Sequence, residues 1–267
     1  MSQPRIMKVG DQHLLDPEQL NSQFRDTMNK LTHERGFVVV RTAYAADDDA
    51  DATEWSAALQ KLRAWACPTD DNAEMDPDTF ALPVIADRET LNGLDYTAVR
   101  RAFAGWVESY LRRTLADDDE DDPWPSDVRH DVCIVADGSA LASLRNAPER
   151  PSAEFMDRGP WVVVLDAQDP ANAPYRGGGP YQGWMRAEAR ALSQLAEDLD
   201  DRTLAGGLCP VREYGGQIPL YDGTPAGRLV DPPGGVAGRY RFPRGTPRGV
   251  DGAQSMLAEI QRANGGL

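Results

Sequence analysis

Three apolar, β-branched runs in the sequence each end in polar side chains that can take part in chemistry. The runs cover residues 37–40, 132–135 and 161–165, and the polar residues after them are Arg41 and Tyr44, then Asp137, then Asp166. If the runs are parallel strands of one open α/β sheet, Arg41, Asp137 and Asp166 converge on the edge where such sheets bind ligands. Two carboxylates there can hold or deprotonate an amine, and a guanidinium can pair with them or with substrate.

These four residues are the first candidates for an active site. Asp137, Asp166 and Tyr44 are the predicted catalytic residues, with the two aspartates on the amine. Arg41 is predicted to bind substrate, orienting its carbonyl end together with Tyr44. The competing interpretation is structural, because an aspartate after a strand often caps the helix that follows.

The segment from Tyr175 to Arg186 is the second candidate, because it combines consecutive glycines with aromatic residues and arginines. Glycines let backbone amides approach a ligand closely, and the start of a following helix favours an anion. Gly178, Trp184 and Arg186 are therefore predicted to bind substrate. The segment lacks both the P-loop order and the Gly-x-Gly-x-x-Gly order after a strand, so it does not indicate a nucleotide site. A flexible turn between a strand and a helix is the alternative.

Charge is distributed unevenly along the chain. The formal net charge is −15, with 12 acidic residues between Tyr44 and Thr90. Such a balance disfavours binding to duplex DNA, which depends on cations that meet phosphates. Residues 225–250, by contrast, contain five arginines and a single aspartate. Four of these are predicted to contact the phosphates of an aminoacyl-tRNA, namely Arg239, Arg241, Arg244 and Arg248. The alternative is that this basic segment packs on the acidic body.

Other common catalytic patterns are absent from the sequence. It contains no Gly-x-Ser-x-Gly elbow, no His-Glu-x-x-His pattern and no EF-hand loop. The acidic run at 117–122 has the Asp-Asp-x-x-Asp order that terpene cyclases use for magnesium, but a dense run of like charges ahead of Pro123 is typical of a solvated loop. We therefore expect neither a metal nor a cofactor.

The composition also predicts a cellular compartment. The three cysteines are far apart and show no Cys-x-x-Cys spacing, which suits a reducing cytosol. No run approaches the roughly 20 apolar residues that span a bilayer. The first 20 residues contain three acidic residues and no apolar signal segment. We expect a cytoplasmic protein without membrane contact, and the sequence leaves its oligomeric state open.

Hydrophobic periodicity predicts the elements that position these residues. Helices are expected from Asp16, from Thr53, from Asp95, near 138–145 and around 192–199, and a weaker edge strand is expected at 82–86. Alternating strands and helices predict an α/β fold, a layered sheet flanked by helices, over residues 1–206. Residues 207–267, crowded with proline and glycine, are expected to form an arm with a terminal helix that packs on this body.

Several short blocks resemble a widespread, uncharacterised group of fungal proteins. The opening block carries the resemblance best, with an apolar strand that ends in Arg-Thr-x-Tyr and a helix that bears tryptophan: residues 37–42, Tyr44, Trp55 and 59–65. Residues 132–141, 159–166 and 183–186 resemble later blocks. Similar modules occur in uncharacterised actinobacterial proteins. The group is similar to fungal arginine-containing cyclodipeptide synthases, which implies use of arginyl-tRNA and a second aminoacyl donor to release a cyclic dipeptide.

Two classes of function fit these observations. The first is a cytosolic biosynthetic enzyme, an aminoacyl or peptide-bond-forming transferase that acts on a cationic amino-acid-derived substrate. The second is an acidic interaction module without catalytic activity, such as an immunity or inhibitor protein that blocks a basic partner. The net charge of −15 supports the second class, because long-range attraction speeds association with a basic partner.

Overall fold

The structure is a computed structural model. It describes residues 7–9, 12–14, 17–31, 34–67, 80–117, 124, 126–151, 159–173, 181–209, 215–224, 227–233, 235–236, 254 and 258. For residues 7–9, 12–14, 17–19 and 114–117 the description is limited to secondary structure. Gly178 and the four arginines Arg239, Arg241, Arg244 and Arg248 lie outside the described residues.

Helices and strands alternate along the first 200 residues, which confirms the predicted α/β class. In chain order the elements are β1 (Met7–Val9), β2 (Gln12–Leu14), α1 (Pro17–Met28), β3 (Arg35–Arg41), α2 (Asp48–Ala66), β4 (Phe80–Ala81), β5 (Val84–Ala86), α3 (Arg88–Leu91), α4 (Tyr96–Asp117), β6 (Asp127–Ala136), α5 (Gly138–Asn146), β7 (Trp161–Asp166), β8 (Trp184–Glu188), η3 (Ala189–Ala191), α6 (Leu192–Asp201), η4 (Leu204–Leu208), β9 (Ile218–Tyr221) and β10 (Arg228–Val230).

The main sheet is mixed. Its strand order is β10-β9-β8-β7-β6-β3-β4, and β5 also pairs with β3. β3 runs parallel to β4, β5 and β6, whereas β7 is antiparallel to both of its neighbours, β6 and β8. β1 and β2 form a separate antiparallel pair.

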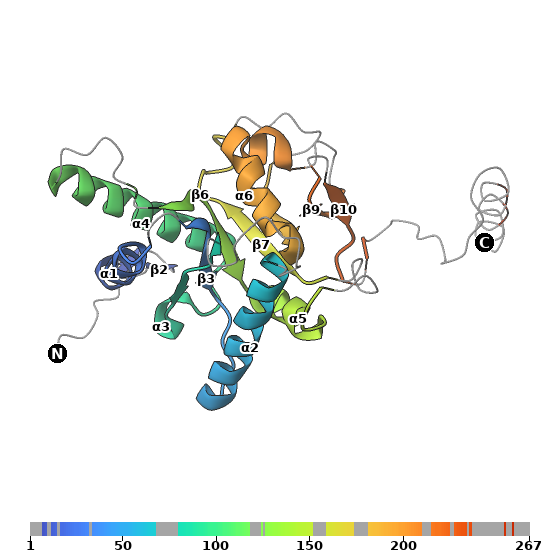
Figure 1. Cartoon of the computed structure of the whole chain (residues 1–267), viewed down its shortest axis with the longest axis horizontal. Helices are drawn as coiled ribbons and strands as arrows, with labels where there is room; N and C mark the ends of the chain where they lie inside the picture. The colour runs from blue at the N-terminus through green and yellow to red at the C-terminus, as the bar shows by residue number, and fades with distance from the viewer. Residues whose placement is uncertain are drawn as a thin grey trace. The chain divides into compact units, whose positions relative to one another are not determined.

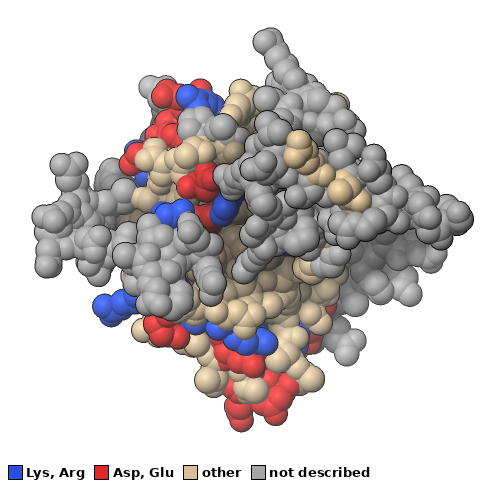
Figure 2. All heavy atoms as spheres, turned by 90° about the vertical axis from the view of Figure 1, so that its right-hand side faces the viewer, with Lys and Arg blue, Asp and Glu red and all other residues tan. Residues whose placement is uncertain are grey.

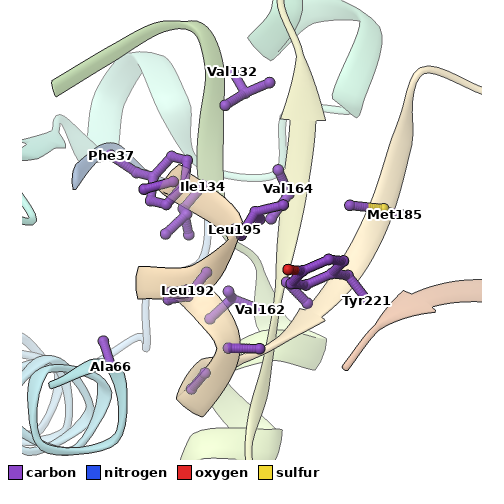
Figure 3. Close-up of a cluster of buried hydrophobic side chains, with 14 of the residues drawn as sticks. Phe37, Ala66, Val132, Ile134, Val162, Val164, Met185, Leu192, Leu195 and Tyr221 are labelled. Carbon is purple, nitrogen blue, oxygen red and sulfur yellow. The ribbon is translucent and has the colours of Figure 1, made fainter. Parts of the chain in front are cut away.

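Helices cover both faces of this sheet (Figure 1). α2, α5 and α6 pack on one face. Figure 3 shows part of this core, with Leu192 and Leu195 of α6 beside Ile134 and Val164 of the strands. α1 and α4 pack on the other face through residues such as Phe24 and Phe103. Side chains alternate along a strand, so β3 contributes to both cores, and a strand buried on both faces reads as a continuous apolar run.

Two elements differ from the sequence-based expectation. α2 begins at Asp48 and not at Thr53, because Asp47 accepts a hydrogen bond from the Ala50 amide and caps the helix five residues earlier. Trp184 and Arg186 lie on β8 and not in a loop before a helix, since this short segment pairs with β7. The expected helix starts at Asp95 and near Gly138 are confirmed.

The chain divides into two compact units, Met1–Val230 and Asp231–Leu267. β9 and β10 lie within residues 207–267, which were expected to form the arm. In the structure they are strands of the main sheet and belong to the first unit. Most residues of the second unit lie outside the described part. Within the expected terminal helix, only positions 254 and 258 are described, and both are helical. No helix in the described ranges is long and apolar enough to cross a membrane.

Candidate functional site

The carboxyl ends of β3 and β6 lie side by side at one edge of the sheet. The two strands are parallel neighbours, with Arg41 paired to Ala136. After β3 the chain passes through α2 to β4 and β5 on one side, and after β6 it passes through α5 to β7 on the other. Adjacent strands whose connections leave in opposite directions form a switch point, which is where open α/β sheets bind ligands.

A cavity of about 570 Å³ lies between α2 and α5 at this switch point. This size is within the range of small-molecule sites. Its walls combine apolar residues of the two helices with eight charged or aromatic side chains: Arg41, Tyr44, Asp51, Glu54, Trp55, Lys61, Arg145 and Glu149.

The inner wall of the cavity is a buried ion pair. The guanidinium Nη2 of Arg41 lies 2.6 Å from Oδ1 of Asp51, and both side chains are about nine-tenths buried or more. The Ala45 amide donates to the same carboxylate oxygen, and Nε of Arg41 donates to the Ala43 carbonyl. Burial alone would raise the pKa of Asp51, but the Ala45 amide and the guanidinium groups of Arg41 and Arg88 outweigh it and hold the pKa below its usual value.

Two aromatic rings hold the Arg41 guanidinium in place. Its Cζ lies 4.2 Å from the ring centroid of Tyr44 and 4.6 Å from that of Trp55. The Tyr44 hydroxyl donates to the Arg41 carbonyl, and burial raises the pKa of Tyr44 to about 12 despite the opposing charge of Arg41. Tyr44 is therefore protonated at neutral pH, with its hydroxyl hydrogen already donated to the Arg41 carbonyl, and it is a poor base. Nη1 of Arg41 has no partner among the described residues, so it can donate to a ligand.

The outer wall carries charges that can exchange partners. Lys61 is buried and donates to the Ala147 carbonyl, and its Nζ lies 3.2 Å from Oε1 of Glu149. Nη2 of Arg145 lies 2.7 Å from Oε2 of Glu54. The side chains of Glu149 and Glu54 are 85% and 53% exposed. The Arg145–Glu54 pair is exposed on both sides and contributes only about 0–1 kcal/mol, so Glu54 can turn to a ligand at little cost. Glu149 is exposed as well, but its partner Lys61 is buried, so Glu149 turns to a ligand at a larger cost, which the hydrogen bond from Lys61 to the Ala147 carbonyl reduces.

Asp137 lies at the same edge as Arg41, as expected, but both of its oxygens are engaged. Oδ1 accepts a hydrogen bond from the Ala140 amide, so Asp137 caps the N-terminus of α5. Oδ2 accepts from the Tyr96 hydroxyl at 2.6 Å. The following residue, Gly138, lines the cavity. This arrangement matches the helix-cap interpretation, and a catalytic role for Asp137 stays a prediction.

Asp166 does not join this edge, so the expected convergence of three residues is wrong. β7 is antiparallel to β6, and Asp166 therefore pairs with Val132, four residues before the end of β6. Its buried carboxylate accepts from the Tyr181 hydroxyl at 2.7 Å and from the Gln168 amide. Burial raises the pKa of Asp166 although these two hydrogen bonds oppose it.

Trp184 and Arg186 lie on the opposite face of the sheet from the cavity. Trp184 packs against the core beneath α1 and α4, and Arg186, two residues along the same strand, shares that face. The ring of Trp184 meets that of Tyr96 at a centroid distance of 5.0 Å. Of the predicted site residues that the structure describes, Arg41 and Tyr44 line the cavity and the others do not.

Sequence reasoning missed the charged residues that α2 contributes to the cavity, and it also missed Arg145 on α5 and Glu149 after α5. The cavity residues of α2 follow helical spacing and so share one face of the helix: Asp51, Glu54, Trp55, Ala58 and Lys61. This face can be recognised in the sequence once the helix is taken to begin at Asp48. Glu149 carries no comparable signal, since its partner Lys61 is 88 positions away and meets it only in the folded chain.

Within the described ranges, no three His, Cys, Asp or Glu side chains are placed together to hold a metal ion. No family model, curated protein or solved structure matches the chain.

Proposed function

We propose that the protein is an enzyme that binds a cationic, amino-acid-derived substrate in the cavity between α2 and α5. The observation that carries this proposal is the composition of the cavity wall. Buried cations and exposed carboxylates share one space of about 570 Å³ with Tyr44 and Trp55. A small molecule with a positive side chain and a polar carbonyl end complements such a wall.

In this proposal the two ends of the substrate meet different parts of the wall. The exposed carboxylates of Glu54 and Glu149 take the guanidinium or ammonium group. Glu54 gives up only a weak surface pair, and Lys61, the partner of Glu149, keeps its hydrogen bond to the Ala147 carbonyl. Nη1 of Arg41 donates to the carbonyl oxygen and stabilises negative charge that develops there, since the guanidinium is already held by Asp51 and two rings.

The finer proposal is peptide-bond formation from aminoacyl-tRNA in the cytoplasm. It is supported by the resemblance to the fungal group, because Arg41, Tyr44 and Trp55 carry that resemblance and also line the cavity. The amino group of one aminoacyl ester would attack the carbonyl carbon of the other, and the second amine would then close the ring. Two tRNAs leave, and the product is a cyclic dipeptide that contains arginine.

A titration with L-arginine tests the coarser proposal. We expect saturable binding to the wild type and much weaker binding of L-citrulline, which has the same shape without the positive charge. The double variant E54Q/E149Q should bind arginine at least about tenfold more weakly, because it removes both carboxylates that face the cation. E108Q is the matched control, since Glu108 forms an exposed pair with Arg112 on α4. Equal affinity for arginine and citrulline would overturn the proposal.

A coupled reaction tests the finer proposal. The protein is incubated with tRNA, ATP, arginine, a second amino acid and the two matching synthetases, and small products are identified by mass spectrometry. A cyclic dipeptide that requires both tRNAs, and that E54Q/E149Q forms more slowly, is the expected result. Arginine binding without any such product would refute the transferase and leave the binding proposal standing.

The acidic interaction module is the second candidate, and the start of α2 favours it. Asp47, Asp48 and Asp49 are exposed there, and Figure 2 shows acidic side chains gathered at the bottom of the view, where α2 begins in Figure 1. This function predicts salt-sensitive binding to a basic protein that neutralisation of these three aspartates abolishes. It predicts no discrimination between arginine and citrulline.

A further inference from the structure

Arg186 differs from the other arginines and lysines that the structure describes. Among those that are not exposed, it alone forms neither a hydrogen bond nor an ion pair with a described residue. Its Nε is buried and has no hydrogen-bond partner. A buried donor without an acceptor is rare in folded proteins and often marks the place of a water, an ion or a ligand.

The Arg186 side chain is nevertheless held in a defined position. Its Cζ lies 3.5 Å from the ring centroid of Trp161, so the guanidinium is stacked on the indole. Stacking occupies the face of the guanidinium and leaves its N–H groups in the plane, where they match the oxygens of a carboxylate or phosphate. The rings of Tyr96 and Trp184 are in contact at a centroid distance of 5.0 Å, and Tyr96 is close enough to Arg186 to act on it electrostatically.

The carboxylate of Asp137 acts electrostatically on Arg186 but is no salt-bridge partner for it. The Ala140 amide and the Tyr96 hydroxyl hold its two oxygens, at 2.8 and 2.6 Å. Burial lowers the pKa of Arg186, although Tyr96 and Asp137 oppose this. The cation is thus partly desolvated without a carboxylate of the described residues in direct contact with it.

We propose that Arg186, stacked on Trp161, binds the carboxylate or phosphate group of a small ligand on the α4 side of the sheet. We define Arg186, Trp161, Tyr96, Trp184 and Asp137 as the Arg186 cluster. The site does not depend on what the cavity binds, because Arg186 and the cavity lie on opposite faces of the sheet.

The N–H groups of the arginine report directly on such a site. In a ¹⁵N-correlated spectrum, the Nε–H signal of Arg186 is assigned by its absence from the R186K variant. Titration with sodium phosphate and, separately, with sodium acetate at constant ionic strength should shift this signal saturably. The anion that binds more tightly identifies phosphate or carboxylate as the recognised group. Sodium chloride serves as the control and should not shift the signal.

Variants separate a specific site from general attraction to positive charge. R186K keeps the charge but loses the planar donors, so the affinity for the preferred anion should fall at least tenfold, measured by calorimetry. R101Q is the matched control, because Arg101 is exposed on α4, and it should bind as the wild type does. If the Arg186 Nε–H signal does not move with either anion, or if R186K binds equally well, the proposal is wrong. If R186K fails to fold, the absence of the signal from the R186M variant supplies the assignment, and the wild-type titration still decides the question.

Discussion

The cavity and the Arg186 cluster place buried or partly buried arginines in opposite electrostatic situations. In the cavity, Arg41 has a carboxylate, a backbone carbonyl and two aromatic rings as partners. In the Arg186 cluster, the guanidinium has one aromatic ring and no acceptor among the described residues. Both guanidinium groups lose hydration, but among the described residues only Arg41 is in direct contact with a carboxylate that compensates this loss.

This difference separates two roles that a buried arginine can have. Arg41, the last residue of β3, is part of the framework, because its partners come from the β3–α2 loop and from α2 and hold these segments together. Arg186 contributes little to the framework and is open to an external partner. A substitution of Asp51 should therefore act mainly on stability, and one of Arg186 mainly on binding.

The largest expected effect comes from breaking the buried pair in the cavity. D51N leaves Arg41 buried without a counter-charge and should lower the free energy of unfolding by about 3–5 kcal/mol. Urea denaturation measures this loss. The double variant R41M/D51L is the control, because replacing both partners with apolar residues removes the unpaired charge and should restore much of the stability. A double variant less stable than D51N would contradict this explanation.

A smaller effect is expected in the pH dependence of the free energy of unfolding, where Asp51 and Asp166 should act with opposite sign. The pKa of Asp51 lies below its usual 3.8, so its stabilisation is present above pH 3.8 and is lost as the pH falls through the lower folded-state pKa. The pKa of Asp166 is raised, so its contribution is largest below pH 3.8 and declines as the pH rises through the folded-state pKa.

Unfolding curves at several pH values, recorded for the wild type, D51N and D166N, check this prediction. The advantage of the wild type over D51N should shrink toward low pH, and its advantage over D166N should shrink toward neutral pH. Parallel trends for the two variants would mean that the two carboxylates do not differ as described.

The smallest expected effect is on stability at Arg186. R186M loses the stacked cation, worth about 0.5–1 kcal/mol, but it also removes a buried donor without a partner, which costs about 1–3 kcal/mol. The two contributions oppose each other, so the unfolding free energy should rise by between about 0 and 2.5 kcal/mol. Thermal and urea unfolding measure it. A loss comparable to that of D51N would show that Arg186 belongs to the framework.

The layers of the fold could be predicted because the buried strands are recognisable in the sequence as short apolar runs. The runs at 37–40, 132–135 and 161–165 are apolar and rich in valine, and all three are strands between two helical layers. The same property hides their direction. A strand buried on both faces shows no polar side, so nothing in 161–165 indicates that β7 runs antiparallel to β6.

The cavity could be predicted only in part, for the same kind of reason. Arg41 and Tyr44 follow a recognisable strand, and their position at a sheet edge follows from that strand alone. Asp166 was misplaced because its location depends on strand direction. Glu149 was missed because it faces the cavity only after α2 and α5 have packed together, which no local pattern records.

The edges of the main sheet have a consequence for how this chain behaves at high concentration. The described edge strands are short, with three residues in β10, two in β4 and three in β5. Leu82 and Pro83 separate β4 from β5, and a proline has no amide hydrogen to offer a neighbouring strand. An intruding β-strand would find few consecutive backbone groups to pair with, so these borders resist the edge-to-edge stacking by which open sheets aggregate.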